Sequence, residues 1–279
     1  MNFPKRVEAA RFPANKRIAV TFSFDDGVDH DRRVVEWFNA HGLKATWNLN
    51  SGSLKREGKP YGKGHLDVSE IADLFRGHEV AIHTVSHPML THLDTAQIAR
   101  EVLEDRIELE NIVGYPVRGM AYPFGNYDTR VIEVLRTLGV VYSRTCENKA
   151  QPFPVAEPLA WPATMHQYDE SQGTVPERFS KMLENPHESG VFFVWGHTYE
   201  FDGRDDWDAL DRLFLPLCGH DDVWYCTNIE LFDYEEARQR LVIAANRGSV
   251  YNPSGLAVTV KVDGKLVEVP AGATISLTA

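Results

Sequence analysis

Two adjacent acids follow an apolar segment near the start of the chain, in the stretch TFSFDDGVDHD. The apolar, β-branched and aromatic residues over 18–24 predict a buried strand, and Gly27 permits a turn directly after Asp25 and Asp26. Neighbouring side chains of a strand point to opposite faces, so only such a turn can bring the two carboxylates together. Two interpretations are open here: a solvated strand end before an acidic helix start, or two acids placed for chemistry.

Two histidines four residues apart, His83 and His87, follow a second apolar segment in AIHTVSHPML. Residues 84–85 are β-branched and Pro88 favours extended geometry before it, which predicts a strand end and a bent loop rather than a helix. The pair can be two ordinary surface or core histidines. With a carboxylate from Asp26, it would form a three-ligand site with room for water, the pattern of a catalytic zinc.

Further candidates lie at the ends of other strand-like segments. If Asp26 binds a metal, Asp25 is free to act as a base on water that the metal has acidified. Arg118 can orient Asp25 and keep it ionised, because an opposite charge favours the carboxylate. His197 ends the apolar segment VFFVWGH and can protonate a leaving group, since its ordinary pKa is about 6.5.

Strand-like and helix-like segments alternate through most of the chain, which predicts right-handed parallel units and an α/β fold. About six to eight units favour a barrel over an open sheet, and barrels place function at the C-terminal ends of their strands. From residue 248 apolar and polar residues alternate around Asp263-Gly264, a hairpin signal. We therefore predict a catalytic barrel over residues 1–247 and a small antiparallel β appendage over 248–279. In the long helical segment 95–113, the residues expected to face the core are Leu103, Ile107, Leu109 and Ile112.

The composition limits the partners. The formal net charge of −11 argues against nucleic acid or an anionic membrane, and favours a neutral or cationic substrate. The chain contains no run of 18 apolar residues, so no membrane span is predicted. The first residues lack the apolar core of a signal peptide, so we expect a cytoplasmic protein, or an extracellular one if a leader has been removed. The three cysteines show no metal-ligand spacing.

Several segments together resemble the motifs of the polysaccharide deacetylase family, a family of carbohydrate esterases whose catalytic unit is the NodB homology domain. SFDDG resembles the first motif, T-F-D-D-G, and HTVSH resembles the second, H-[ST]-x-x-H. RGMAYPFG resembles the third, R-x-x-x-Y-P-x-G, and FFVWGH resembles the last. HGLKATWNLN is similar to the family's G-x-K-A-T-F-F strand. The motifs occur in the family's order, and the resemblance covers about residues 15–241.

This resemblance implies a distorted, incomplete (β/α) barrel. It also implies a hydrolase of non-peptide carbon–nitrogen bonds that removes acetyl groups from N-acetylated or O-acetylated sugars. The implied catalytic residues are Asp25 as general base, Arg118 as its tether, the backbone N–H of Tyr122 at the oxyanion and His197 as general acid. The implied metal ligands are Asp26, His83 and His87. The metal would be zinc, with Co²⁺, Ni²⁺ or Mn²⁺ as alternatives.

Some features depart from the family pattern. Its fourth motif, an Asp followed shortly by Trp that orients the acid histidine, is not recognisable, so the partner of His197 is left open. Trp195 stands near the position of the family's usual leucine and would narrow the pocket for the acetyl methyl group. Aromatic residues can stack on sugar rings, with core packing as an equal alternative for each. The aromatic candidates are Trp47, Tyr122, Trp195 and Tyr199.

Two other functions are kept as alternatives. One is a metal-independent cyclic imide or ureide hydrolase of the same superfamily, which the set of Asp26, His83 and His87 opposes. The other is a non-catalytic relative that binds a glycan without hydrolysing it. In each sugar-directed case the expected partner is a carbohydrate, and a homo-oligomer is compatible with the sequence.

Overall fold

A computed structural model describes residues 3–58 and 64–278 of the chain. Its centre is a nine-stranded sheet in which the described pairings are parallel. The order is β7-β6-β5-β4-β3-β2-β9-β8, and β10 pairs with the first part of β2. The strands are β2 (Ile18–Asp25), β3 (Thr46–Leu49), β4 (Glu79–Ile82), β5 (Gly119–Ala121), β6 (Tyr142–Asn148), β7 (Trp161–Ala163), β8 (Met165–His166), β9 (Gly190–Gly196) and β10 (Val223–Tyr225).

The two ends of this sheet are neighbours in the sequence. Thr164 alone separates β7 from β8, so the sheet must curl until its edges approach each other. The backbone N–H of Thr164 donates to Phe193 O of β9 at 2.8 Å, which fixes this corner. No described ladder joins β7 to β8. The predicted distorted, incomplete barrel is therefore confirmed.

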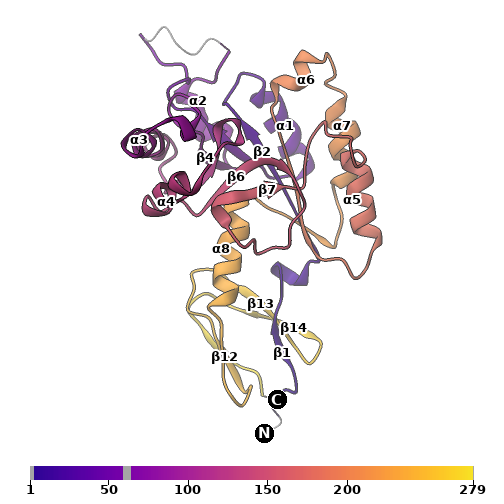
Figure 1. The fold of residues 1–279 in the computed structure, drawn as a ribbon. Helices are drawn as coiled ribbons and strands as arrows, with labels where there is room; N and C mark the ends of the chain where they lie inside the picture. Colours follow the sequence, from indigo (N-terminus) through magenta and orange to yellow (C-terminus); the bar gives the residue numbers. More distant parts are fainter. Residues whose placement is uncertain (1–2, 59–63, 279) are drawn as a thin grey trace.

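Helices surround the curled sheet, with α2, α3 and α4 on one side and α5 and α7 on the other (Figure 1). Glycine ends two of them: Gly42 after α1 and Gly114 after α3 have φ values of 69° and 76°, which L side chains rarely adopt. The helices are α1 (Asp31–His41), α2 (Val68–Leu74), α3 (Thr95–Val113), α4 (Thr129–Thr137), α5 (Val175–Glu184), α6 (Tyr199–Gly203), α7 (Ala209–Phe214) and α8 (Asn228–Gln239). Among the described residues, no helix has both the length and the apolar character needed to cross a membrane.

The core prediction for α3 was partly wrong. Leu109 is buried, but Leu103 and Ile107 are 41% and 49% exposed. The face of α3 that enters the core carries Ile98 and Val102 instead. Those two residues lie four positions apart, and Leu109 lies seven positions after Val102, so all three share one stripe of the helix.

Strand β2 is the centre of the hydrophobic core, and all eight of its residues are buried. Phe22 and Phe24 pack edge-on against Phe38 of α1, with ring centroids 4.9 and 5.6 Å apart. Strand β9 pairs with one edge of β2, while β10 and β3 share the other edge. This central strand therefore carries Asp25, its last residue, to the middle of the sheet's C-terminal edge.

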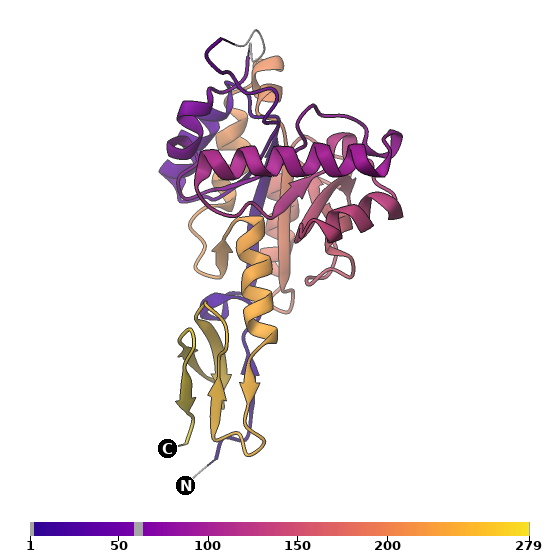
Figure 2. The ribbon, with the colours of Figure 1, turned by 90° about the vertical axis from the view of Figure 1, so that its left-hand side faces the viewer.

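The β appendage continues from the C-terminal end of α8, and the described ends of the chain lie toward its far tip, away from the helix (Figure 2). The predicted hairpin is confirmed: β13 and β14 are antiparallel, and Asp263 and Gly264 form its turn with φ values of 46° and 89°. Two strands from before residue 248 join the appendage, because β1 pairs with β13 and β11 pairs with β12. Its extent thus differs from the predicted 248–279. The strands are β1 (Val7–Ala9), β11 (Val242–Ile243), β12 (Ser249–Tyr251), β13 (Val258–Val262), β14 (Lys265–Val269) and β15 (Thr274–Ser276).

Candidate active site

Several parallel strands bring polar side chains to one edge of the sheet. Because the C-terminal ends of parallel strands meet at the same edge, residues that are far apart in the sequence become neighbours there. Arg144 lies inside β6, but it pairs in register with Ala121, the last residue of β5, and so reaches the same level. The residues at this edge are Asp25 and Asp26 at the end of β2, His83 after β4, Arg144 in β6 and His197 after β9.

Asp26, His83 and His87 converge on one point. Oδ1 of Asp26 lies 3.6 Å from Nε2 of His83 and 3.7 Å from Nε2 of His87. The three potential ligand atoms all lie within 4.8 Å of one another. Positive φ values at Asp26 (83°) and His87 (56°) turn both side chains inward. Such conformations are costly for residues with a Cβ and persist where the surroundings impose them.

His83 is presented with a free Nε2. Its Nδ1 lies 2.8 Å from Ala121 O, and since a carbonyl can only accept, Nδ1 must carry the proton. Burial lowers the pKa of His83, which favours the neutral imidazole that a metal requires. The carboxylate of Asp105 on α3 accepts from the backbone N–H groups of His83 and Ser51 at 3.0 and 2.8 Å. Two imidazoles and one carboxylate with an open side fit a divalent cation such as zinc.

Asp25 is buried beside this cluster and is held by Arg144. The Arg144 guanidinium donates to Asp25 Oδ2, and Asn48 Nδ2 donates to Oδ1 at 2.9 Å. Burial opposes ionisation of Asp25, but the positive charge of Arg144, with His83 and His197, outweighs it and lowers its pKa to about 2. Asp25 is therefore a carboxylate at neutral pH.

The structure does not place Arg118 at Asp25, which corrects the sequence prediction. Arg118 directly precedes β5, so it lies at the opposite edge of the sheet from the strand ends. Its guanidinium binds both carboxylate oxygens of Asp233 on α8, at 2.9 and 2.7 Å. Arg144 takes the position that the motif spacing had suggested for Arg118.

Tyr122 and Trp47 also differ from their predicted roles. The backbone N–H of Tyr122 donates to Arg144 O at 3.0 Å, as part of the pairing of β5 with β6, so it is not available to an oxyanion. Its phenol donates to Leu159 O at 2.7 Å. The Trp47 side chain is 0% exposed and lies between Phe24 and Phe75, with ring centroids 5.1 and 5.0 Å away. Trp47 is a core residue and cannot contact a substrate.

His197 faces Asp25 on one side and Glu200 on the other. Nε2 of His197 lies 3.8 Å from Asp25 Oδ2, and its Nδ1 lies 2.9 Å from Glu200 Oε1. Burial lowers the pKa of His197, but the hydrogen bond to Glu200 and the charges of Asp25 and Asp26 outweigh it, so the pKa is raised. Glu200 is thus the partner of His197 that the sequence had left open.

Trp195 and Tyr199 both contact this site. The Arg144 guanidinium lies over the Trp195 indole, 4.5 Å from the ring centroid. The indole N–H of Trp195 donates to Asn148 Oδ1 at 2.8 Å. Tyr199 stacks on His197 with the ring centroids 4.9 Å apart, and it is 40% exposed. Trp195 is almost fully buried, so Tyr199 offers more surface to a ligand.

Sequence reasoning missed Arg144, Glu200 and Asp105. Glu200 had a local signal, because it lies three residues after His197 in HTYE, within reach of a helical turn. Arg144 ends the apolar segment VVYSR, which placed it near a strand end but gave no partner. Asp105 had a weaker signal: an acid on the buried stripe of a helix must be paired with donors.

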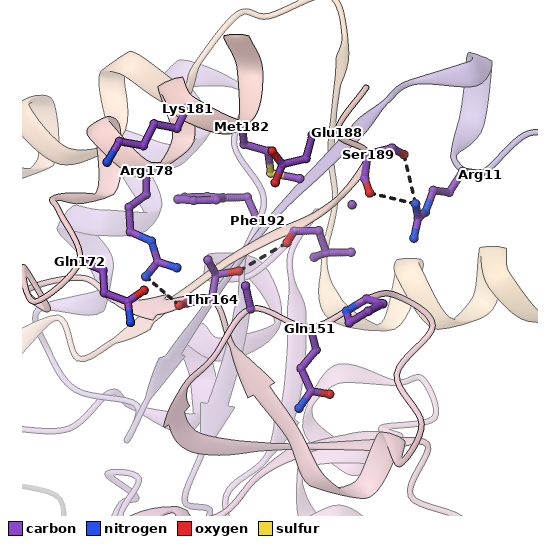
Figure 3. A pocket seen from close by; sticks show the side chains of 14 residues that line it. Arg11, Gln151, Thr164, Gln172, Arg178, Lys181, Met182, Glu188, Ser189 and Phe192 are labelled. Carbon is purple, nitrogen blue, oxygen red and sulfur yellow. Dashed lines mark hydrogen bonds between the residues drawn. The ribbon is translucent and has the colours of Figure 1, made fainter. Parts of the chain in front are cut away.

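A cavity of about 580 Å³ lies elsewhere, at the beginning of β9 (Figure 3). Arg11 on its wall donates to Phe153 O at 2.6 Å and Ser189 O at 2.9 Å, and Arg178 donates to Thr164 O at 3.1 Å. A strand rises about 3.3 Å per residue, which puts the two ends of β9 about 20 Å apart. This cavity is therefore separate from the edge that carries Asp25.

Comparisons with known proteins show what this chain is similar to. Residues 13–143 match the family model described as Polysaccharide deacetylase. The peptidoglycan-N-acetylglucosamine deacetylase PgdA of Listeria monocytogenes is 29% identical over 135 residues, 45% of this chain and 25% of the relative. The chain thus spans about a quarter of the length of this curated relative.

Two solved structures share the fold. A Mycobacterium smegmatis protein assigned to the polysaccharide deacetylases is 17% identical and has a TM-score of 0.60, with 85% of this chain and 96% of that one covered. A family 4 acetyl xylan esterase from Clostridium thermocellum, solved in complex with a cobalt ion, is 16% identical and has a TM-score of 0.53. That match covers 78% of this chain and 92% of the esterase.

Proposed function

We propose that this chain, which belongs to the polysaccharide deacetylase family, is a metal-dependent hydrolase that releases acetate from N-acetylated or O-acetylated sugars. One observation carries the proposal: Asp25 lies between the candidate metal ligands and the candidate acid. Its Oδ2 is 4.0 Å from His83 Nε2 and 3.8 Å from His197 Nε2. A base, an acid and a three-ligand cluster in contact are the parts that hydrolysis of an acetyl group requires.

Asp26, His83 and His87 would hold the cation, with zinc preferred and Co²⁺, Ni²⁺ or Mn²⁺ as alternatives. When bound there, a divalent cation supplies a Lewis acid that polarises the acetyl carbonyl and lowers the pKa of water to about 7. Asp25 alone is a weak base, because its pKa is about 2. The proposal therefore requires the metal, and the set of ligands opposes a metal-independent hydrolase.

The residues of the chain divide the proton transfers between them. Asp25 accepts a proton from the water whose oxygen bonds to the acetyl carbon. His197, whose pKa is raised by Glu200, is protonated over a wider pH range than a free histidine and gives its Nε2 proton to the departing nitrogen or oxygen. The carbon–nitrogen or carbon–oxygen bond breaks, and acetate and the free amine or hydroxyl leave.

Aromatic side chains near His197 support a carbohydrate as substrate. The exposed ring of Tyr199 is the candidate platform for a sugar face, and Trp195 is the candidate wall against the acetyl group. PgdA, by its name, acts on N-acetylglucosamine of peptidoglycan, and the Clostridium relative acts on acetylated xylan. Both N-acetyl and O-acetyl sugars are therefore the substrates to test.

The test is acetate release by the full chain after its metal has been stripped, before and after Zn²⁺ or Co²⁺ is added. The panel contains N-acetylglucosamine oligomers, de-N-acetylated oligomers as blanks, and acetylated xylan. We expect release that returns only with metal. Zinc binding without acetate release from any substrate would favour the non-catalytic glycan binder. Acetate release that does not depend on metal would overturn the proposed mechanism.

A further inference from the structure

One oxygen atom of Glu200 serves two imidazoles. Oε1 lies 2.9 Å from Nδ1 of His197 and 3.2 Å from Nε2 of His166, the last residue of β8. Both histidines are partly buried, and their ring centroids are 6.3 Å apart. Glu200 therefore lies between two potential hydrogen-bond donors, although the proposed reaction uses His197 alone.

The backbone settles which nitrogen of His166 carries its proton. Nδ1 of His166 accepts the backbone N–H of Tyr168 at 3.2 Å, so Nε2 is the nitrogen that carries a proton and donates to Glu200. His166, His197 and Glu200 also have the composition of a metal site. A cation on Nε2 would leave His166 without any proton, because Nδ1 already faces a donor. The cluster is accordingly a hydrogen-bond network.

Gln167 binds the second carboxylate oxygen of Glu200. Its Nε2 donates to Glu200 Oε2 at 3.1 Å and to His197 O at 2.9 Å. Gly196 makes room for this side chain, since a Cβ at that position would lie 2.4 Å from Gln167 Cδ. Glu200 is thus held at both oxygens, and small movements of its carboxylate toward His197 are restricted.

We propose that His166 is a positioning residue. By donating to the same oxygen of Glu200, it weakens the hydrogen bond between Glu200 and His197. Two donors on one acceptor share its negative charge, so each is held less strongly than it would be alone. Glu200 favours the protonated form of His197, and His166 limits that effect. The relevance to catalysis rests on the proposed function, whereas the effect on His197 itself does not.

Other charged groups face His197, and none of them changes in the test variants. Asp25 on β2 lies 3.8 Å from Nε2, and Asp26 adds a further negative charge nearby. Tyr199 on α6 stacks on the ring, but its pKa is raised to about 12 by burial, so it is neutral. A metal on Asp26, His83 and His87 would act on all variants alike. Differences between variants therefore isolate the network around Glu200.

The experiment is an NMR titration of the His197 ring in the full chain loaded with Zn²⁺. The variants are E200Q, H166L and H166Q, and H187L is the matched control at an exposed histidine at the other end of β9. E200Q should lower the pKa of His197 by about one unit, because a charged acceptor is lost. H166L should raise it by about half a unit, because a competing donor to the same oxygen is lost. H166Q, which can still donate, and H187L should leave it unchanged.

The two opposite shifts are the signature of a shared acceptor. A general loss of structure would not shift the His197 pKa upward in H166L and leave H166Q unchanged. If H166L lowers the pKa or has no effect, His166 does not moderate Glu200 and the inference is overturned. If H166L fails to fold, H166M, which likewise cannot donate to Glu200 Oε1, takes its place. The same upward shift of the His197 pKa is then expected, and an unchanged or lowered pKa would contradict the inference. Failure of the proposed function appears separately, as absence of acetate release by the wild-type chain.

Discussion

The guanidinium of Arg144 donates to the carboxylate of Asp25, and both side chains are almost completely buried. The two residues are 119 positions apart in the sequence. Arg144 also donates to Ser23 Oγ at 3.2 Å and to Thr145 O at 3.2 Å, so its position does not depend on Asp25 alone. This buried pair holds the candidate base ionised beside the candidate metal ligands.

Replacing Arg144 should affect both stability and activity. R144M leaves the buried charge of Asp25 without its partner, and breaking a buried pair in this way costs about 3–5 kcal/mol. Asp25 will then bind a proton at higher pH than about 2, its present pKa. We expect acetate release to be lost near neutral pH. Urea unfolding and the pH profile of activity measure both effects.

Arg118 is the matched control for that experiment. Its ion pair with Asp233 is 34% exposed on the arginine side, so R118Q should cost no more than about 1 kcal/mol. Activity should remain close to wild type, because Arg118 lies at the other edge of the sheet. Loss of activity in R118Q with Arg144 intact would restore the original assignment from the motif.

The adjacent acids should separate into two functions. D26N removes a proposed metal ligand and should weaken zinc binding strongly, together with acetate release. D25N keeps Asp26, His83 and His87 and should retain zinc, but lose turnover by about 100-fold or more, the usual effect of removing a general base. Zinc content and acetate release are measured on the same preparations. Full activity in D25N would show that Asp25 is not the base.

Asp105 should influence the metal through His83. Its two oxygens accept backbone N–H groups of His83 and Ser51. D105N replaces one acceptor with a donor that faces an N–H group, so the backbone that carries His83 must move. Mutation of a residue that orients a metal ligand typically lowers metal affinity about 10–100-fold. A competition assay with a zinc chelator can measure this change. E104Q, the exposed neighbour on α3, is the control and should have no effect.

Glu200 should make the free energy of unfolding depend on pH in acidic solution. Burial opposes ionisation of Glu200, but hydrogen bonds from His166 and His197 outweigh it and lower its pKa to about 2. A folded-state pKa below the unfolded value gives stability that is present above about pH 4.5 and is lost as the pH falls toward 2. The shift corresponds to at most about 3 kcal/mol.

The measurement is the free energy of unfolding of wild type and E200Q at pH 6, 5, 4 and 3. Wild type should be the more stable protein at pH 6, and the difference should shrink steadily below pH 5. Asp25 titrates in both proteins and therefore cancels. A difference that stays constant down to pH 3 would mean that Glu200 is not held as a carboxylate by the two histidines.

Local patterns were enough to predict the class of fold and the centre of the site. Alternating strand and helix segments determine parallel units, and parallel strands must end at one edge. The central candidate residues each end or follow an apolar strand segment, or lie in the loop after it, so they reach the same edge of the sheet. They are Asp25, Asp26, His83, His87 and His197. The turn at Asp263-Gly264 was likewise readable, because only a few residues adopt the positive φ values that a two-residue hairpin needs.

Tertiary structure decided which side chains meet around that centre. Arg118 directly precedes β5, whereas Arg144 lies inside β6 and level with the end of β5. The register that separates the two arginines comes from packing across the sheet. From the sequence alone Trp47 could stack on a sugar or pack in the core, and the structure decides for the core because both faces of its strand are covered. A sequence records the order of residues along a strand. It does not record the lateral register or the packing on each face, because these depend on contacts between segments that are distant in the chain.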